Sequence, residues 1–269
     1  MTQNRIEVPV ANDPNDIKDQ FQALVDIIKI LRKECPWDKK QTNESIAHLT
    51  IEEAYETITA IQEGDDKEFS KELGDLTLHI IMHAIMAEER GAFGLLEVLT
   101  QIQTKLVHRH PHVFGDITVN GEDDVLNNWE ALKMKEGKKS ILEGVPLTLP
   151  ALLRTERIQQ KVARRGFDWD NKEDMWNKVF EEIAEFKSEL KNGDTQKAKE
   201  EFGDILFAMV NAARFEDIVA EESLQLTNNK FTKRFNYVEE KVKETGKTFE
   251  EFTLAELDVF WDQAKAMGL

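Results

Sequence analysis

Eight carboxylates in the sequence form two sets of four, and each set is arranged symmetrically about a glycine. The members of the first set stand eight and eleven residues before and after Gly64, and those of the second stand at the same distances from Gly193. In an antiparallel pair of helices, residues equally far from the turn lie side by side, and residues three apart share one face. Each set is therefore expected to converge in space. The sets are Glu53, Glu56, Glu72 and Asp75, and Glu182, Glu185, Glu201 and Asp204.

Converging carboxylates need a source of positive charge. Two carboxylates about 5 Å apart repel each other by roughly 3 kcal/mol at an effective dielectric constant of about 20. Carboxylate oxygens suit hard cations, so the pattern favours Mg²⁺, with Mn²⁺ as its chemical substitute. The alternative is glutamates solvated on exposed helix faces, but that does not explain why the mirror spacing occurs twice. A di-iron site is not favoured, because none of the six histidines follows a glutamate by three residues.

The two acidic sets belong to an internal repeat. EEAYE at 52–56 and ELGD at 72–75 recur as EEIAE at 181–185 and EFGD at 201–204, each offset by 129 residues. A glycine precedes each aspartate, at Gly74 and Gly203, although a glycine within a helix costs about 1 kcal/mol relative to alanine. We therefore predict two homologous domains, at 17–136 and 151–269, joined by a linker at 137–150 that contains turn residues.

The segments that carry these residues have the apolar periodicity of helices with one buried face. Strand-like alternation is nearly absent, so the predicted fold class is all-α, with two tandem helical bundles. The stretch before Ile17 has no periodic pattern and is expected to be a loose tail. Helices are expected to begin at Ile17 and to cover 46–62, 67–90, 95–108, 151–163, 173–190, 196–215, 222–243 and 254–266.

Charge and composition exclude several classes of partner. The chain has 35 Lys and Arg against 52 Asp and Glu, and its net charge of −17 disfavours nucleic acid polymers and anionic lipid. No apolar run is long enough to span a membrane, and no signal-peptide pattern opens the sequence. The single cysteine, Cys35, excludes an internal disulfide, so we expect a soluble, cytoplasmic protein. A small anionic ligand fits this charge if metal ions lie beside it.

A basic pair follows each acidic set on the next predicted helix. The two residues of each pair are four apart and project from one face, where lysine and arginine can hold phosphate oxygens. A tryptophan near the end of each half is suited to stacking on a base. Alone, such features are more often surface charge or core packing, but both recur. The pairs are Lys105 with Arg109 and Lys230 with Arg234, and the tryptophans are Trp129 and Trp261.

In combination these features resemble one known family, MazG. Besides EExxE and ExxD, the resemblance rests on CPWDKKQT, KLVHRHPHVF, LPALLRTERIQQK and GFDWD, and it covers the chain from about residue 20 to residue 265. MazG proteins belong to the all-α nucleoside triphosphate pyrophosphohydrolase superfamily. The resemblance implies an intertwined homodimer, hydrolysis between the α and β phosphates, and broad specificity for ribo- and deoxynucleotides.

Carried over position by position, the resemblance implies a complete site in the second domain. The first domain matches at its four metal ligands and at Lys105, Arg109 and Trp129, but Leu49 stands at the position of Lys178 and Glu68 at that of Lys197. We predict that the second domain is the main catalytic one and that the first is weaker, inactive or regulatory. In the second domain the implied metal ligands are Glu182, Glu185, Glu201 and Asp204, the nucleotide contacts are Lys178, Lys197, Lys230, Arg234 and Trp261, and the catalytic candidates are Glu181, Glu182 and Glu200.

The expected reaction is attack of water on the α-phosphorus with pyrophosphate as the leaving group. A glutamate of the cluster would accept the proton, and Glu181 and Glu200 are both candidates because they adjoin the metal ligands. One alternative is a nucleotide-binding regulator that keeps the site without turnover, and another is a purely structural helical protein. A regulator would be marked by a broken ligand set, and a structural protein does not require eight matched carboxylates. No glycine-rich P-loop is present.

Overall fold

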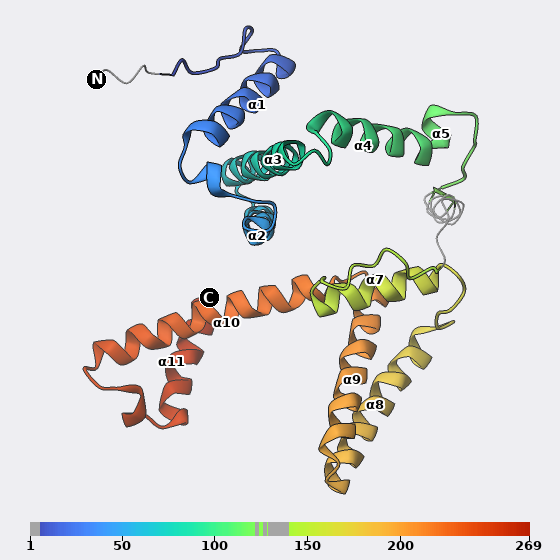
Figure 1. Ribbon diagram of the computed structural model, residues 1–269. Helices are drawn as coiled ribbons and strands as arrows, with labels where there is room; N and C mark the ends of the chain where they lie inside the picture. Colours follow the sequence, from blue (N-terminus) through green and yellow to red (C-terminus); the bar gives the residue numbers. More distant parts are fainter. Residues whose placement is uncertain (1–5, 122–123, 126–127, 129–139) are drawn as a thin grey trace. The chain divides into compact units, whose positions relative to one another are not determined.

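The computed structural model describes residues 6–121, 124–125, 128 and 140–269. These residues form helices joined by turns, and no strand occurs among them, which confirms the all-α prediction. The expected helices agree with the observed ones to within two residues at their ends. Figure 1 shows the helices along the chain. The chain divides into two compact units, 1–125 and 126–269. Among the described helices, none combines the length and the apolar character that a bilayer-spanning segment requires.

Each unit is built around one long antiparallel helix pair, α2 with α3 in the first and α8 with α9 in the second. The first unit contains α1 (Ile17–Glu34), η1 (Asp38–Lys40), α2 (Ala47–Glu63), α3 (Asp66–Glu89), α4 (Leu95–Arg109) and α5 (Pro111–Phe114). The second contains α7 (Ala151–Ala163), α8 (Lys172–Asn192), α9 (Thr195–Phe215), α10 (Ala220–Glu244), η2 (Phe249–Glu251) and α11 (Leu254–Ala266).

The predicted linker, 137–150, begins outside the described residues. Its described part packs on the second unit, because the Lys161 side chain of α7 donates a hydrogen bond to the backbone carbonyl of Ile141 at 3.0 Å. The position of the domain boundary stays a prediction.

A glycine and an aspartate close each acidic helix pair. Gly64 ends α2 with φ of 68° and Gly193 ends α8 with φ of 75°, in the left-handed region that strains other residues. The next residues, Asp65 and Asp194, begin α3 and α9 because their side chains accept hydrogen bonds from backbone N–H groups of the first turn. The same turn therefore reverses the chain twice and places residues at equal distances from the glycine side by side.

The two helix pairs pack against different cores. In the second unit one buried hydrophobic cluster consists of four residues, two of them alanine, and a cavity lies between α7, α8 and α9. The first-unit core is filled by larger aliphatic side chains. The first core comprises Val25, Ile28, Ile46, Ile81, Met82, Ile85 and Met86, and the second comprises Met175, Val179, Ala208 and Ala212.

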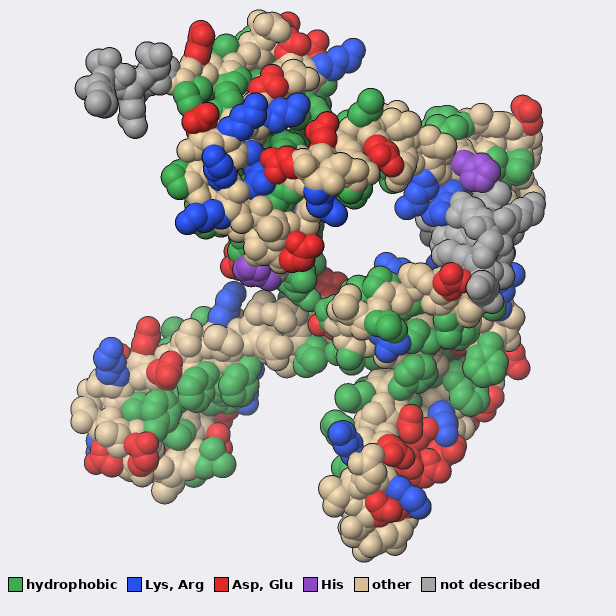
Figure 2. Space-filling view, viewed as in Figure 1, with side chains coloured by type: hydrophobic (Ala, Val, Ile, Leu, Met, Phe, Trp, Pro, Cys, Tyr) green, Lys and Arg blue, Asp and Glu red, His purple; other side chains and the backbone are tan. Residues whose placement is uncertain are grey.

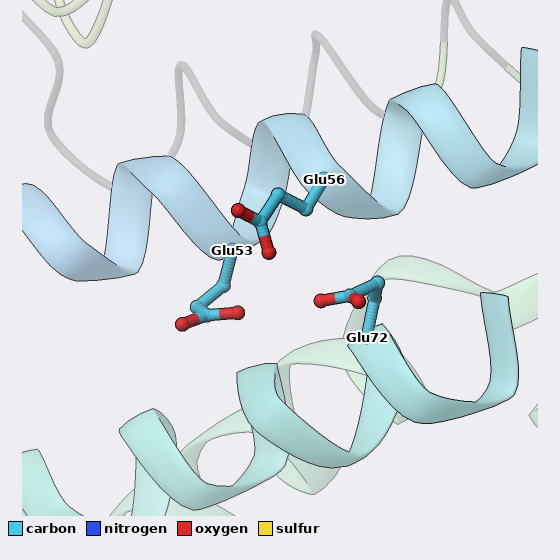
Figure 3. Close-up of side chains that lie close together, drawn as sticks. All are labelled: Glu53, Glu56 and Glu72. Atoms are coloured by element: carbon cyan, nitrogen blue, oxygen red, sulfur yellow. The ribbon is translucent and has the colours of Figure 1, made fainter. Parts of the chain in front are cut away.

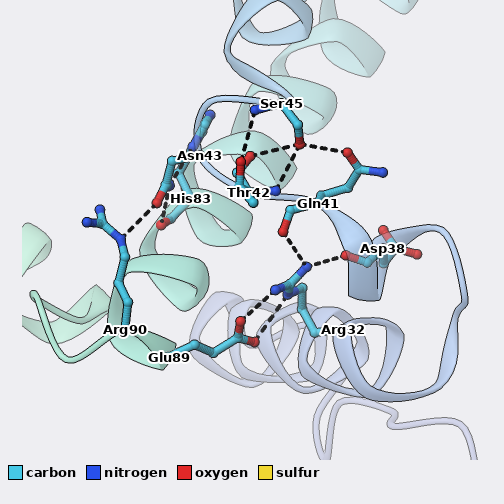
Figure 4. Close-up of polar contacts among 9 residues, drawn as sticks. All are labelled: Arg32, Asp38, Gln41, Thr42, Asn43, Ser45, His83, Glu89 and Arg90. Atoms are coloured by element: carbon cyan, nitrogen blue, oxygen red, sulfur yellow. Dashed lines mark hydrogen bonds and ion pairs between the residues drawn. The ribbon is translucent and has the colours of Figure 1, made fainter.

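Arg32 of α1 holds in place the segment that precedes the helix pair α2 and α3. Its buried guanidinium donates to both carboxylate oxygens of Glu89, at 3.1 and 2.5 Å, near the end of α3 (Figure 4). It also donates to the backbone carbonyls of Asp38 and of Gln41, the latter at 3.2 Å. One side chain of α1 therefore holds both α3 and the segment that contains CPWDKKQT, which gives this motif a structural role.

Candidate active site

Three of the four carboxylates predicted for the second domain come together between α8 and α9. Each of Glu182, Glu185 and Glu201 offers one carboxylate oxygen, and these oxygens all lie within 4.8 Å of one another. Glu182 is buried, whereas Glu185 is exposed. Figure 2 shows acidic side chains gathered along this helix pair, beside hydrophobic side chains where the pair meets α7. We call these three residues the second acidic trio.

Burial raises the pKa of Glu201, and the neighbouring charges of Glu185, Glu182 and Asp204 raise it further. A cation among these oxygens would relieve the repulsion, so the donor set fits a hard divalent ion such as Mg²⁺. Asp204 acts on Glu201 electrostatically, yet it is not part of the close trio. The expected four-way convergence is therefore seen for three residues, because the aspartate side chain is one carbon shorter than a glutamate and reaches less far between the helices.

Lys178 is the cation that lies against the second acidic trio. Its Nζ lies 2.7 Å from Glu182 and 2.8 Å from Glu181, which are on the same helix face. The hydrogen bonds to Glu181 and Glu182 raise the pKa of Lys178, so its charge is retained. The second catalytic candidate beside the ligands, Glu200, accepts a hydrogen bond from Gln196 at 3.0 Å. The backbone N–H of Lys197 donates a hydrogen bond to the side chain of Asp194 at the start of α9.

The other predicted nucleotide contacts of the second domain form a separate group on α10 and α11. Arg234 donates to the backbone carbonyl of Leu269 at 2.6 Å, and its guanidinium lies 5.8 Å from the ring centre of Trp261. Trp261 also packs on Phe231, with ring centres 5.0 Å apart, and Lys230 is exposed on α10. Among the contacts of the described residues, none joins this group to the second acidic trio.

A cavity of about 480 Å³ adjoins the second acidic trio between α7, α8, α9 and the loop that precedes α8. Glu182 and Asp204 line one part of it, together with Lys178. Sequence reasoning missed this cavity and most of its polar lining. The GFDWD motif was a signal for it, and so were polar residues at positions that are apolar in the first repeat. The residues missed were Gln159, Phe167, Trp169, Asn211 and Arg214.

The first acidic set also converges as a trio. One carboxylate oxygen each from Glu53 and Glu56 of α2 and from Glu72 of α3 lie within 4.8 Å of one another (Figure 3). Burial raises the pKa of Glu53, and the negative charge of Asp75 is the next largest cause. Burial also raises the pKa of Glu56, where the negative charge of Glu72 is the next largest cause. Glu72 is only 2 % exposed, and among the described residues no hydrogen-bond donor reaches its Oε2. This buried, unpaired oxygen fits a bound cation.

A lysine that the sequence analysis did not consider compensates the first trio. Lys71 Nζ lies 2.9 Å from Glu72 and 2.7 Å from Glu68, and its hydrogen bonds lower the pKa of Glu72. Offset by 129 residues, Lys71 corresponds to Glu200, a catalytic candidate of the second domain. The first unit thus differs from the second at this position as well as at Leu49 and Glu68.

Two histidines of the first unit stand at positions where the second unit has alanines. The Nε2 atom of buried His79 lies 3.8 Å from Glu53 Oε1. The Thr50 hydroxyl bridges the two histidines, at 3.1 Å from His79 Nδ1 and 3.0 Å from His83 Nε2. Their counterparts at an offset of 129 residues are Ala208 and Ala212. The predicted basic pair, Lys105 and Arg109, lies on α4, and Trp129 lies outside the described residues.

Comparison with known proteins agrees with the duplicated site. A family model described as the MazG nucleotide pyrophosphohydrolase domain matches residues 41–114 and 170–239. A nucleoside triphosphate pyrophosphohydrolase/pyrophosphatase MazG of Thermotoga maritima is 42% identical over 91% of this chain and 95% of its own length. A nucleoside triphosphate pyrophosphohydrolase of Escherichia coli K12 is 40% identical over 92% of this chain and 97% of its own length. The uncharacterized protein YabN of Bacillus subtilis is 44% identical over 97% of this chain, which spans 54% of that protein.

Proposed function

Because the chain belongs to the MazG nucleotide pyrophosphohydrolase family, we propose that it hydrolyses nucleoside triphosphates to monophosphates and pyrophosphate. The substrates would be ribo- and deoxynucleotides of broad base identity, and the reaction would depend on Mg²⁺, with Mn²⁺ as a substitute. The observation that carries the proposal is the second acidic trio, which lies beside Lys178 and opens onto a cavity of about 480 Å³.

The roles in the second unit follow from charge and position. A bound Mg²⁺ lowers the pKa of an attacking water and neutralises charge on the phosphate oxygens. Glu182, Glu185 and Glu201 would hold the ion, with Asp204 close by. Lys178 would turn from Glu182 to orient the phosphates, which is electrostatic and positional work. Glu181 and Glu200, next to the ligands in sequence, are the proposed acceptors of the water proton.

We propose that the second unit performs most of the turnover. In the first unit Lys178 and Lys197 are replaced by Leu49 and Glu68, so two phosphate contacts are missing. Lys71 replaces Glu200 and is bound to a carboxylate of the trio. The first trio keeps a set of oxygens that fits a cation, which supports a regulatory or weakly active site there.

A homodimer is also part of the proposal. Large apolar side chains lie exposed on the second acidic helix pair, including Phe180 at 62 %, Phe202 at 49 % and Leu206 at 44 %. Large exposed apolar side chains are typical of protein interfaces where they gather in one patch. A second copy of the chain that covers this pair could also bring Lys230, Arg234 and Trp261 to the trio. The mass of the protein in solution, measured by light scattering, tests this.

Product analysis tests the activity. The protein is mixed with each common ribo- and deoxynucleoside triphosphate and Mg²⁺, and the products are separated by chromatography that resolves mono- from diphosphates. Monophosphate with pyrophosphate, lost on addition of EDTA, is the expected result. Diphosphate with phosphate would overturn the cleavage position, and binding without any product would favour the nucleotide-binding regulator.

A further inference from the structure

Gln159 of α7 lines the cavity beside the second acidic trio and carries a buried, unpaired hydrogen-bond acceptor. Its Nε2 donates to the backbone carbonyl of Phe207 at 2.8 Å, which fixes Oε1 as the other end of the amide. The residue is only 4 % exposed, and among the described residues no donor reaches Oε1. Leaving a buried acceptor unpaired is energetically unfavourable. A ligand with an N–H group in the cavity would remove this cost.

Asn211 of α9 supplies the complementary donor. Arg214 donates to its Oδ1 from both Nε, at 3.0 Å, and Nη2, at 2.7 Å. Asp168 holds the same guanidinium from the loop before α8, at 2.5 Å. Because Oδ1 accepts both bonds, Nδ2 is the end of this amide that can donate to a ligand in the cavity. The cavity therefore offers one acceptor and one donor, both held in place by other residues.

The lining of the cavity suits an aromatic ligand. Phe167, Trp169 and Phe207 line it, and Trp169 is 42 % exposed. Its volume of about 480 Å³ lies within the range of small-molecule sites, roughly 300–1,000 Å³. Glu182 and Asp204 also line it. A base in contact with these aromatic residues would therefore share the cavity with Glu182 of the acidic trio.

The first unit does not repeat these polar groups. Met82 and Ile85 stand at the positions of Asn211 and Arg214, and both are buried in the aliphatic core. His79 stands at the position of Ala208, which lines the cavity, and His83 at that of Ala212 in the adjoining buried cluster. The amide pair thus belongs to the unit that has Lys178, and not to the duplicated architecture as such.

We infer that this cavity binds the nucleobase and that Gln159 Oε1 and Asn211 Nδ2 recognise its Watson–Crick edge. The inference rests on the proposed function. Adenine, guanine, cytosine, uracil and thymine all carry an N–H donor beside an acceptor on that edge, so one donor-acceptor pair can bind each of them. Gln159 and Asn211 are then specificity-determining residues that distinguish a nucleotide from other polyphosphates while accepting every common base.

The test compares Gln159→Met with the matched variant Gln160→Met, whose side chain does not line the cavity. Two substrates are used, ATP and purine riboside triphosphate, which lacks the amino group that would donate to Oε1. We expect Gln159→Met to raise the KM for ATP about 10-fold with little change in kcat, because one buried hydrogen bond is lost. The KM for purine riboside triphosphate should be high in the unaltered protein and unchanged by Gln159→Met. Gln160→Met should change neither.

Binding of α,β-methylene ATP, measured by calorimetry, provides a second readout that does not need turnover. A weaker affinity in Gln159→Met, with thermal unfolding as in the unaltered protein, supports the inference even if no triphosphate is cleaved. Absence of pyrophosphate release by the unaltered protein would overturn only the proposed function. Equal KM increases for both substrates, or no change for either, would overturn the base-recognition role of Gln159.

Discussion

Lys178 Nζ lies 2.7 Å from Glu182 Oε1 one helical turn away, so a predicted phosphate contact and a predicted metal ligand form an ion pair. The equivalent residue of the first repeat is Leu49, which packs against the core of its unit. The two units therefore place a lysine at their carboxylates from different helix positions, Lys178 in the second unit and Lys71 in the first.

Replacing Lys178 by methionine is expected to lower kcat/KM on the order of 100-fold, because a charge that stabilises the transferring phosphates is removed. The rate of pyrophosphate release checks this. The matched control is Lys172→Met on the same helix, since Lys172 pairs with Glu216 at 2.8 Å and does not line the cavity. An equal loss in both variants would argue against a specific role for Lys178.

Glu182→Ala or Asp204→Ala is expected to abolish most turnover, whereas Glu53→Ala should leave a large fraction. The reason is that the first unit lacks the lysines that would orient a triphosphate. The effect is measured as the steady-state rate of hydrolysis. The substrate is the triphosphate that the unaltered protein cleaves best in the product analysis. The opposite pattern, with activity lost in Glu53→Ala and kept in Glu182→Ala, would assign catalysis to the first unit.

Cation binding at the second acidic trio should weaken as the pH falls, and at a higher pH than for an ordinary glutamate site. The pKa of Glu201 is raised by burial and by its neighbours, so a proton competes with the ion already above the usual glutamate pKa of about 4.3. Electron paramagnetic resonance of Mn²⁺ over a pH series measures this. The double variant Glu53→Gln with Glu56→Gln serves as background, because it removes the first trio. Affinity independent of pH down to the usual glutamate range would contradict the prediction.

Arg32→Met is expected to destabilise the first unit by about 1.5–3 kcal/mol, because several hydrogen bonds to a buried guanidinium are lost. Denaturant unfolding gives the value, and the exposed neighbour Lys33→Met is the control. The hydrogen bond from Arg32 lowers the pKa of Glu89. Its contribution to stability is therefore present above the ordinary glutamate pKa and is lost as the pH falls through the lowered value. This acid-dependent loss should disappear in Arg32→Met.

The sequence by itself determined the helices, the duplicated architecture and the carboxylates that meet. Apolar periodicity fixes which face of a helix is buried, and Gly64 with Asp65 fixes where the chain reverses. Equal distances from that turn then dictate which side chains are neighbours, as Glu56 and Glu72 are. These properties are local or follow from a single turn, so they can be read along the chain.

The sequence also showed that the first repeat lacks two lysines of the second. Only the tertiary structure decided which further contacts distinguish the repeats. The pairing of Lys71 with Glu72 and the position of Asp204 outside the close trio depend on side-chain reach between helices. The cavity with Gln159 and Asn211 requires α7 to pack on α9 so that a space remains beside α8, where small residues such as Ala208 line it. Packing distances between elements arise from the volumes of many side chains at once, and no spacing along the sequence encodes them.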